Sequence, residues 1–445
     1  MKKYVKDMTV GKPANLLLSF MLPMVLGNVF QQLYNLVDSM IVGKYVGSDA
    51  LAAVGATGSL NFLFFSLCGG LSNGIGIIIS QHFGAGNESG VKRTIANATY
   101  IMATAAILMG VLGFVTAKPL LAFLNTPDNI LDDSAMYMQI MCAGVVAVAL
   151  YNCVSAMLRA LGDAKTPLYF LIFASILNIV LDLVFVNVFH WGIAGAGWAT
   201  IISQFLAGIA SLLFALKKNL YFKLEREQLS FDKEITRRCV RMGIPLAFQS
   251  SLIAISCVIL QSVVNSFGSV VIAAFTATSR VEQLVQQPYN SLGMAVSTYT
   301  GQNIGAGKLD RVKKGFRAGF LIMSIFTFCM LPLAQFGGNW IMKLFVDEVE
   351  VIEMGTTALR LTSWFYLPLG AIYVARGLLN GAGDASFAFI NGVCEMLGRI
   401  CFAKPFTMIP KVGVWGVWLA TAMTWFVTGT ISVLRYLQGK WKHTY

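Results

Sequence analysis

Charged residues are scarce in this chain. Only 12% of its 445 residues are Asp, Glu, Lys or Arg, whereas soluble globular domains contain about 25%. So few charges cannot cover the surface of a soluble protein of this length, which excludes that class. Hydrophobic residues make up 56% of the chain, and long apolar runs recur from Leu16 to Leu437. These runs indicate an all-α polytopic membrane protein.

Patterns for disulfides, metals and enzyme chemistry are also missing. The eight cysteines include no CxxC pair and lie almost entirely within apolar runs, where cysteine acts as a small hydrophobe. The three histidines are scattered without ligand spacing: His82, His190 and His443. There is no HExxH motif, no cofactor loop and no nucleophile–base spacing. We therefore expect no disulfide, no structural metal, no cofactor and no enzymatic activity.

The net charge of +12 has a simple explanation in a membrane protein. Basic loops are what the positive-inside rule predicts, so we expect no nucleic-acid partner. The amino-terminal segment 1–13 is basic but has no cleavage site after a short apolar core, which indicates a cytoplasmic tail and not a signal peptide.

Apolar windows predict twelve transmembrane helices. Their expected ranges are 16–43, 50–81, 94–117, 134–158, 167–189, 192–215, 242–265, 270–300, 315–336, 355–379, 386–408 and 414–437. If the N-terminus is cytoplasmic, 24 Lys and Arg residues lie in or beside the cytoplasmic segments and 5 lie outside. This bias predicts that both termini are cytoplasmic.

The chain contains an internal repeat. Four pairs of segments match at one shared offset of 221 residues: 47–57 with 268–278, 81–93 with 302–314, 161–164 with 382–385, and 192–200 with 413–421. The glycine-rich GAG turns within them lack the spacing and preceding strand of a phosphate-binding loop, so we interpret them as tight turns between helices. The repeat predicts two pseudo-symmetric six-helix lobes, 1–220 and 241–445, joined by a cytoplasmic loop at 221–240.

Two acids, Asp38 and Asp182, fall inside predicted spans. An ionised carboxylate at the centre of a membrane helix costs about 2.5–3.5 kcal/mol on insertion scales. Membrane helices keep such a group when it faces a partner or a water-filled cavity. The presence of both acids within membrane spans therefore predicts an ion or proton site in the first lobe.

Other polar residues share the faces of these acids. The first helix carries polar residues at steps of three or four: Asn28, Gln31, Asn35 and Asp38. Asn178 precedes Asp182 by four residues. At about 1.5 Å per residue, Asp38, Asp182 and Thr200 each lie roughly 10 Å below the outer rim, and Asn152 lies nearer the cytoplasm. Such oxygens can hold Na⁺ transiently or share a proton; alternatively, each acid hydrogen-bonds within the bundle.

The second half of the chain lacks this acid pair. Adding 221 to Asn178 gives Arg399, and adding 221 to Asp182 gives Ala403. Arg399 and Glu395 are four residues apart, so we expect them to form an ion pair. Glu282 is expected either to face a substrate cavity or to pair with an arginine. We assign to this cavity Gln31, Tyr34, Asn35, Glu282, Gln283 and Gln286.

Together these segments resemble the multidrug and toxic compound extrusion (MATE) family, and most closely its DinF-like bacterial branch. The resemblance covers nearly the whole chain and rests on several motifs: PxxxxNxxQQLYNLVDSMIVG at 23–43, GxxxxAAVG at 47–55, QxxGAG in both halves, LRALGDAKTP at 158–167, NIVLDLVF at 178–185 and GIAGAGWAT at 192–200.

The resemblance implies two lobes that face a central cleft and that export amphiphilic or cationic compounds in exchange for H⁺ or Na⁺. It implies a cation site at Asp38, Asn152, Asn178, Asp182 and Thr200. It also implies that Pro23 is a hinge in the first helix.

We therefore expect a proton- or sodium-coupled multidrug antiporter in the bacterial inner membrane. It is expected to be a monomer whose partners are small molecules and the lipid bilayer. The alternative on the same scaffold is a lipid-precursor flippase, with Arg280, Arg376 and Arg399 available for a pyrophosphate group. A passive channel is disfavoured because the sequence shows no filter-like motif.

Overall fold

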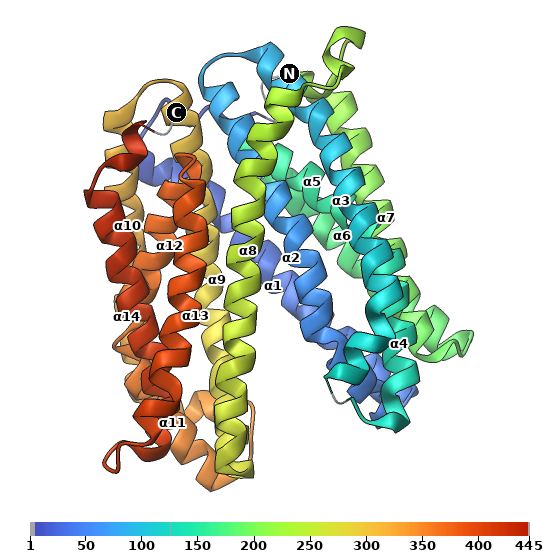
Figure 1. Ribbon diagram of the computed structural model, residues 1–445, viewed down its shortest axis with the longest axis vertical. Coiled ribbons are helices and arrows are strands. Elements are labelled where there is room, and N and C mark those ends of the chain that lie inside the picture. Colours follow the sequence, from blue (N-terminus) through green and yellow to red (C-terminus); the bar gives the residue numbers. More distant parts are fainter. Residues whose placement is uncertain (1–4, 125, 444–445) are drawn as a thin grey trace. The chain divides into compact units, whose positions relative to one another are not determined.

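The described part of the chain is built from helices. The structure, a computed structural model, describes residues 5–124 and 126–443, which contain no strand (Figure 1). The α-helices in chain order are α1 (Pro13–Tyr45), α2 (Ser48–Gly84), α3 (Glu88–Phe123), α4 (Asp128–Ala143), α5 (Val145–Ala160), α6 (Lys165–Asp182), α7 (Gly192–Lys218), α8 (Lys233–Val264), α9 (Ser269–Gly305), α10 (Leu309–Met342), α11 (Val349–Ser363), α12 (Tyr366–Gly381), α13 (Ala385–Thr407) and α14 (Gly416–Leu437).

Many of these helices are long and apolar enough to cross a bilayer. Among the described residues, nine helices meet this criterion, or ten if α4 and α5 form one bent span. An all-α polytopic membrane protein is thereby confirmed. The count of twelve spans stays a prediction. The predicted cytoplasmic ends of the chain, at residues 1–4 and 444–445, lie outside the described residues.

Two of the predicted continuous helices are broken in the structure. The predicted span 134–158 is split at Gly144, where α4 and α5 meet at a bend of 46°. The predicted span 355–379 is split at residues 364–365, between α11 and α12. The breaks are repeat-related, since 144 plus 221 is 365. Apolar windows cannot reveal such breaks, because hydropathy does not change where the helix bends.

The predicted span 167–189 also changes form. Its first part is α6, and directly after Asp182 the chain becomes a π-helix, η2 (Leu183–Val188). The Phe189 N–H donates to the Val184 carbonyl at 2.9 Å, five residues back. Short π-helical segments occur often at functional sites. No feature of the sequence around Asp182 predicts this widened turn.

The internal repeat is visible in the backbone. Each of the four matched motif pairs places a glycine with positive φ at the same position in both halves: Gly47 and Gly268, Gly86 and Gly307, Gly162 and Gly383, Gly192 and Gly413. In the GAG turns, the Gly86 N–H donates to the Phe83 carbonyl at 3.1 Å, and the Gly307 N–H donates to the Ile304 carbonyl at 2.9 Å. Both turns close a helix with a left-handed glycine, which confirms that they are tight turns.

The chain divides into two compact units. One unit comprises Met1–Asp7 and Leu22–Ala247, and the other comprises Met8–Met21 and Phe248–Tyr445. Both α1 and α8 therefore contribute residues to each unit. The predicted lobe limits at 220 and 241 stay a prediction.

Helices within each unit pack closely through small residues. In the first unit, α2 contacts α5 where Gly76 lies against the Ala156 carbonyl. In the second unit, α9 contacts α12, and a Cβ at Gly377 would meet the backbone of Gly293. Such glycines let two helix backbones approach closely, as is common in membrane bundles. This packing fixes the helices that carry the polar residues described below.

Two turn glycines give a matched stability test. We expect Gly86→Ala to destabilise the protein by about 1–2 kcal/mol, because alanine disfavours positive φ. Gly162→Ala should destabilise it more, because its Cβ would also meet the backbone carbonyl of Lys6, whereas nothing lies within 4 Å of that position at Gly86. Thermal unfolding of the purified variants in detergent measures both effects. Equal losses for the two variants would contradict this packing.

Candidate functional site

The two intramembrane acids of the first unit lie face to face. Asp38 is in the second half of α1, and Asp182 is the last residue of α6. Their side chains are within hydrogen-bonding reach of each other, so one proton can bridge them. Asp182 is fully buried, and Asp38 is half-buried. The predicted proximity of these acids thus appears in the structure.

No other donor satisfies these carboxyl groups. Asp38 Oδ1 and both carboxyl oxygens of Asp182 have no hydrogen-bond partner among the described residues. None of the ion pairs seen within 4 Å in the described chain includes either acid. An ionised carboxylate that is buried without a partner is strongly unfavourable. The pair therefore requires a proton or a bound cation to be neutral.

Neutral oxygen ligands lie beside the acids. Asn178 is one helical turn before Asp182 on α6 and is almost fully buried. Its amide nitrogen donates to the Thr200 hydroxyl on α7 at 3.4 Å, which leaves its carbonyl oxygen without a partner. Carboxylate, amide and hydroxyl oxygens are hard ligands that suit small cations such as Na⁺. The arrangement can hold either a cation or a proton.

Tyr137 and Gln204, which the sequence analysis did not identify, complete the surroundings. Tyr137 of α4 is buried and lies close enough to both acids to be affected by their charges. Its ring packs where Gly197 of α7 has no side chain. Tyr34 of α1 shares hydrogen bonds with Gln31 and with Gln204 of α7. These contacts join α4 to α7 and α1 to α7, so spacing along one helix could not reveal them.

Asn152 is placed differently from the other predicted ligands. It lies half-buried on α5, and its side chain makes no hydrogen bond with another residue that the structure describes. Its neighbour Tyr151 donates to the Pro167 carbonyl at 3.0 Å. The structure thus brings together Asp38, Asn178, Asp182 and Thr200, and the inclusion of Asn152 in a cation site stays a prediction.

The position of Asp182 depends on how α6 begins. Asp163, from the repeated LGDA motif, accepts hydrogen bonds through Oδ1 from the N–H groups of Lys165 at 3.0 Å and Thr166 at 2.9 Å. In the second half, Asp384 likewise accepts from the Phe387 N–H at 3.2 Å at the start of α13. Capping residues of this type stabilise the first turn of a helix.

The second unit carries a different set of polar residues. Glu282 of α9 is buried, its Oε1 has no partner, and its carboxyl group interacts with Thr362. Gln286 Oε1 accepts from the Tyr373 hydroxyl at 3.0 Å, and Gln283 is exposed. Arg399 affects Glu282 electrostatically but forms no ion pair with it within 4 Å. The assignment of these residues to a substrate cavity stays a prediction.

The expected ion pair between Glu395 and Arg399 is absent from the described residues. Arg399 instead donates through Nη1 to the Ser256 hydroxyl at 2.6 Å, and Glu395 Oε2 has no partner. The interpretation was wrong because residues four apart on a helix lie on one face only approximately. Here a hydroxyl on the neighbouring α8 offers the guanidinium a closer acceptor.

Comparison with known proteins identifies the family. The family model MatE matches residues 23–184 and 245–403, one segment in each half of the chain. The chain belongs to the MatE family. The resemblance inferred from the motifs is therefore confirmed, and this MatE chain is a multi-pass membrane protein.

Relatives cover almost the full chain. The "Probable multidrug resistance protein YpnP" of Bacillus subtilis is 32% identical and covers 99% of this chain and 98% of its own length. The "Probable multidrug resistance protein NorM" of Thermotoga maritima is 22% identical over 99% of this chain and 96% of its own. A crystal structure of MATE in the bent conformation superposes with a TM-score of 0.92 at 22% identity, covering 99% of both chains. That likeness shows a shared fold.

The two ends of α6 give opposite predictions. Asp163→Ala should destabilise this MatE protein by about 1 kcal/mol, because it removes the side-chain acceptor that caps the helix. Asp182→Asn should stabilise it in the absence of a bound cation, because it removes a buried charge without a partner. Thermal unfolding in sodium-free detergent solution compares the two. Destabilisation by both substitutions would show that Asp182 is satisfied in the folded protein.

Proposed function

We propose that this protein is a cation-coupled antiporter that exports amphiphilic or cationic compounds across the bacterial inner membrane. The names of its relatives, several of which are multidrug resistance or export proteins, support export of drug-like molecules. The proposed coupling is based on the facing pair Asp38 and Asp182, three of whose four carboxyl oxygens are buried without a donor among the described residues.

The proposed mechanism begins with the charge on this pair. When a proton or Na⁺ enters, it neutralises the acids and removes the cost of their burial. The side chain of Asp38 can then pack closely against α6, which changes the stability of the second half of α1. A cation that binds more tightly to one conformation of the protein shifts the population toward that conformation.

Pro23 provides a place where α1 can respond. Proline has no N–H, so residue 23 cannot donate the hydrogen bond that a helical residue normally donates at that turn. The boundary between the two compact units also crosses α1 at Met21 and Leu22, directly before Pro23. Under this proposal, a change at Asp38 bends α1 at Pro23. The two lobes then alternate between inward and outward access, as is typical of transporters built from repeats.

The substrate is proposed to bind near polar residues of both halves: Gln31, Tyr34, Asn35, Glu282, Gln283 and Gln286. Gln31 and Asn35 are exposed on α1, and Tyr34 is half-buried. Glu282 supplies negative charge for a cationic compound. Because ion and substrate must each change the affinity for the other, the coupling between them is reciprocal.

The first test removes the charge on α1. In inverted vesicles with an imposed ion gradient, Asp38→Asn should abolish gradient-driven ethidium transport, because the pair can no longer gain and lose a positive charge. In wild type, the ion gradient should stimulate ethidium transport by about 5–150-fold, the usual size of such coupling, and Asp38→Asn should lose this stimulation. Repeating the assay without Na⁺ at fixed pH identifies the coupling ion.

Asp132→Asn is the matched control for Asp38→Asn. Asp132 is an exposed acid that pairs with Lys118 at 2.6 Å, so its loss should leave transport unchanged. Gradient-driven transport that survives Asp38→Asn would refute the proposed coupling site.

A second test concerns Glu282. For a cationic substrate, Glu282→Gln should raise the KM about tenfold, because hydrogen bonds to a charged group contribute about 1.5–3 kcal/mol. The ion dependence of transport should not change. Glu395→Gln removes another buried acid of the same unit and should have little effect. A similar KM for wild type and Glu282→Gln would exclude Glu282 from the substrate site.

A further inference from the structure

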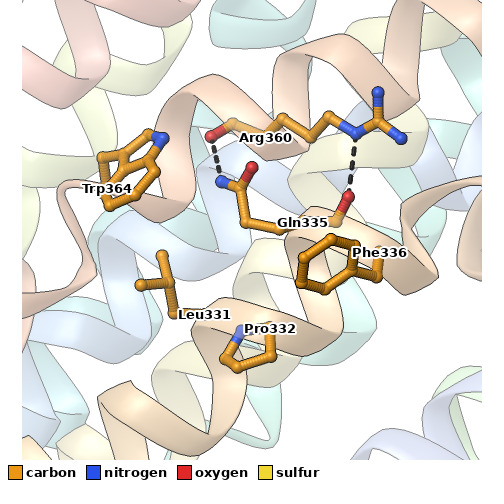
Figure 2. A pocket seen from close by; sticks show the side chains of 6 residues that line it. All are labelled: Leu331, Pro332, Gln335, Phe336, Arg360 and Trp364. Atoms are coloured by element: carbon orange, nitrogen blue, oxygen red, sulfur yellow. Dashed lines mark hydrogen bonds between the residues drawn. The ribbon is translucent and has the colours of Figure 1, made fainter.

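A groove on the second unit has a composition unlike the surface around it. It has a volume of about 520 Å³ and lies between α10 and the end of α11 (Figure 2). Its lining consists of four apolar side chains and two polar ones: Leu331, Pro332, Phe336, Trp364, Gln335 and Arg360. Volumes of about 300–1,000 Å³ are typical of ligand sites.

The groove opens on a face of α10 whose exposed apolar side chains are suited to contact lipid. Large apolar side chains are exposed along this helix at intervals of about one or two helical turns, including Leu321, Ile325, Phe328, Phe336 and Trp340. Phe336, which lines the groove, is 88% exposed. A helical stripe of this kind on a membrane protein faces the acyl chains of the bilayer. An occupant of the groove therefore arrives from the lipid.

The groove lies at the depth of lipid headgroups. Gln335 is 18 residues beyond Arg317, the last basic residue of α10, which corresponds to about 27 Å along the helix. The hydrocarbon core of a bilayer is about 30 Å thick, so Gln335 is near the interface at the α10–α11 end. The exposed indoles of Trp340 and Trp364 agree with this depth, because tryptophan gathers at membrane interfaces.

Arg360 is held in place in the groove with its charge unpaired. Its Nε donates to the Gln335 carbonyl at 2.9 Å, and the Gln335 amide nitrogen donates back to the Arg360 carbonyl at 2.8 Å (Figure 2). The side chain is exposed, forms no ion pair within the described residues, and its two Nη nitrogens have no hydrogen-bond acceptor among those residues. This fixed fork matches the geometry of a phosphate or carboxylate.

The break between α11 and α12 explains why Arg360 and Gln335 can form these hydrogen bonds. α11 ends at Ser363, so the Arg360 carbonyl is free of the helical ladder and accepts from Gln335 and from the Ser363 hydroxyl at 2.9 Å. These bonds fix the backbone of Arg360, and the Gln335 amide nitrogen also donates to the Ser363 hydroxyl at 2.8 Å. The guanidinium is then the cationic group available to a ligand at the groove.

We propose that this groove binds an anionic phospholipid. Arg360 holds the phosphate of the headgroup through its free Nη nitrogens, and Leu331, Phe336 and Trp364 cover the first part of an acyl chain. A cation on a lipid-facing surface is costly without a counter-ion, and a lipid phosphate at this depth supplies one. The proposal does not depend on the transport function.

Quenching of tryptophan by brominated acyl chains tests this site. The full-length protein is reconstituted in phosphatidylcholine vesicles that contain either brominated phosphatidylglycerol or brominated phosphatidylcholine at equal mole fraction. The difference in quenching between proteins with and without the Trp364→Phe substitution measures the contact of lipid with the groove. In wild type, this difference should show about fivefold preference for phosphatidylglycerol, the effect of one basic residue near an anionic lipid.

Charge variants decide the role of Arg360. Arg360→Gln should reduce the preference to about one, and Arg360→Lys should retain part of it, because the charge is kept and the fork is lost. Lys343→Gln removes an exposed positive charge at the end of α10 and should leave the preference unchanged. Circular dichroism verifies that each variant is folded.

Several outcomes would overturn the proposal. Equal quenching by the two lipids in wild type would show that the groove does not select an anion. Full competition by excess inorganic phosphate would show a site for a free anion and not for a lipid. If Arg360→Gln does not fold, Arg360→Lys provides the test. Equal quenching by the two brominated lipids in that variant would show that positive charge at this position does not hold the lipid.

Discussion

Burial of two facing carboxyl groups is the constraint on which the first unit depends. Asp38 and Asp182 are held by α1 and α6, yet no positively charged side chain reaches them and three of their oxygens have no partner in the described chain. Such a pair is stable only when it is neutral. Because no cationic side chain in the described chain pairs with these acids, the proposed function assigns their neutralisation to a mobile ion.

The repeat gives the two halves the same backbone but not the same chemistry. Four positive-φ glycines and one helix break recur at an offset of 221 residues, and Asp163 and Asp384 cap equivalent helices. The acids do not recur: the position equivalent to Asn178 is Arg399, which binds Ser256. A duplicated scaffold with a single acid pair fits the proposal that the ion acts on one half and that polar groups of the other half, such as Glu282, contact the substrate.

Particular elements show how far the sequence could predict the fold and the site. Hydropathy and the glycine turns located the helices because both depend on local composition. Spacing placed Asn178 beside Asp182 because helical geometry alone relates residues four apart. The ion pair expected between Glu395 and Arg399 failed, and Tyr137 and Gln204 were missed, because their partners lie on neighbouring helices. The groove at Arg360 likewise depends on the break after α11.

The sequence by itself determined that this is a helical membrane protein of the MatE family with two intramembrane acids, because hydropathy, motif and helical period are local properties of a chain. Only the tertiary structure decided which groups face one another. It left the acids without donors, placed Tyr137 against Gly197, and left the charge of Arg360 open on a lipid-facing groove. Those outcomes depend on contacts between helices far apart in sequence, where small differences in packing select one hydrogen-bond partner over another.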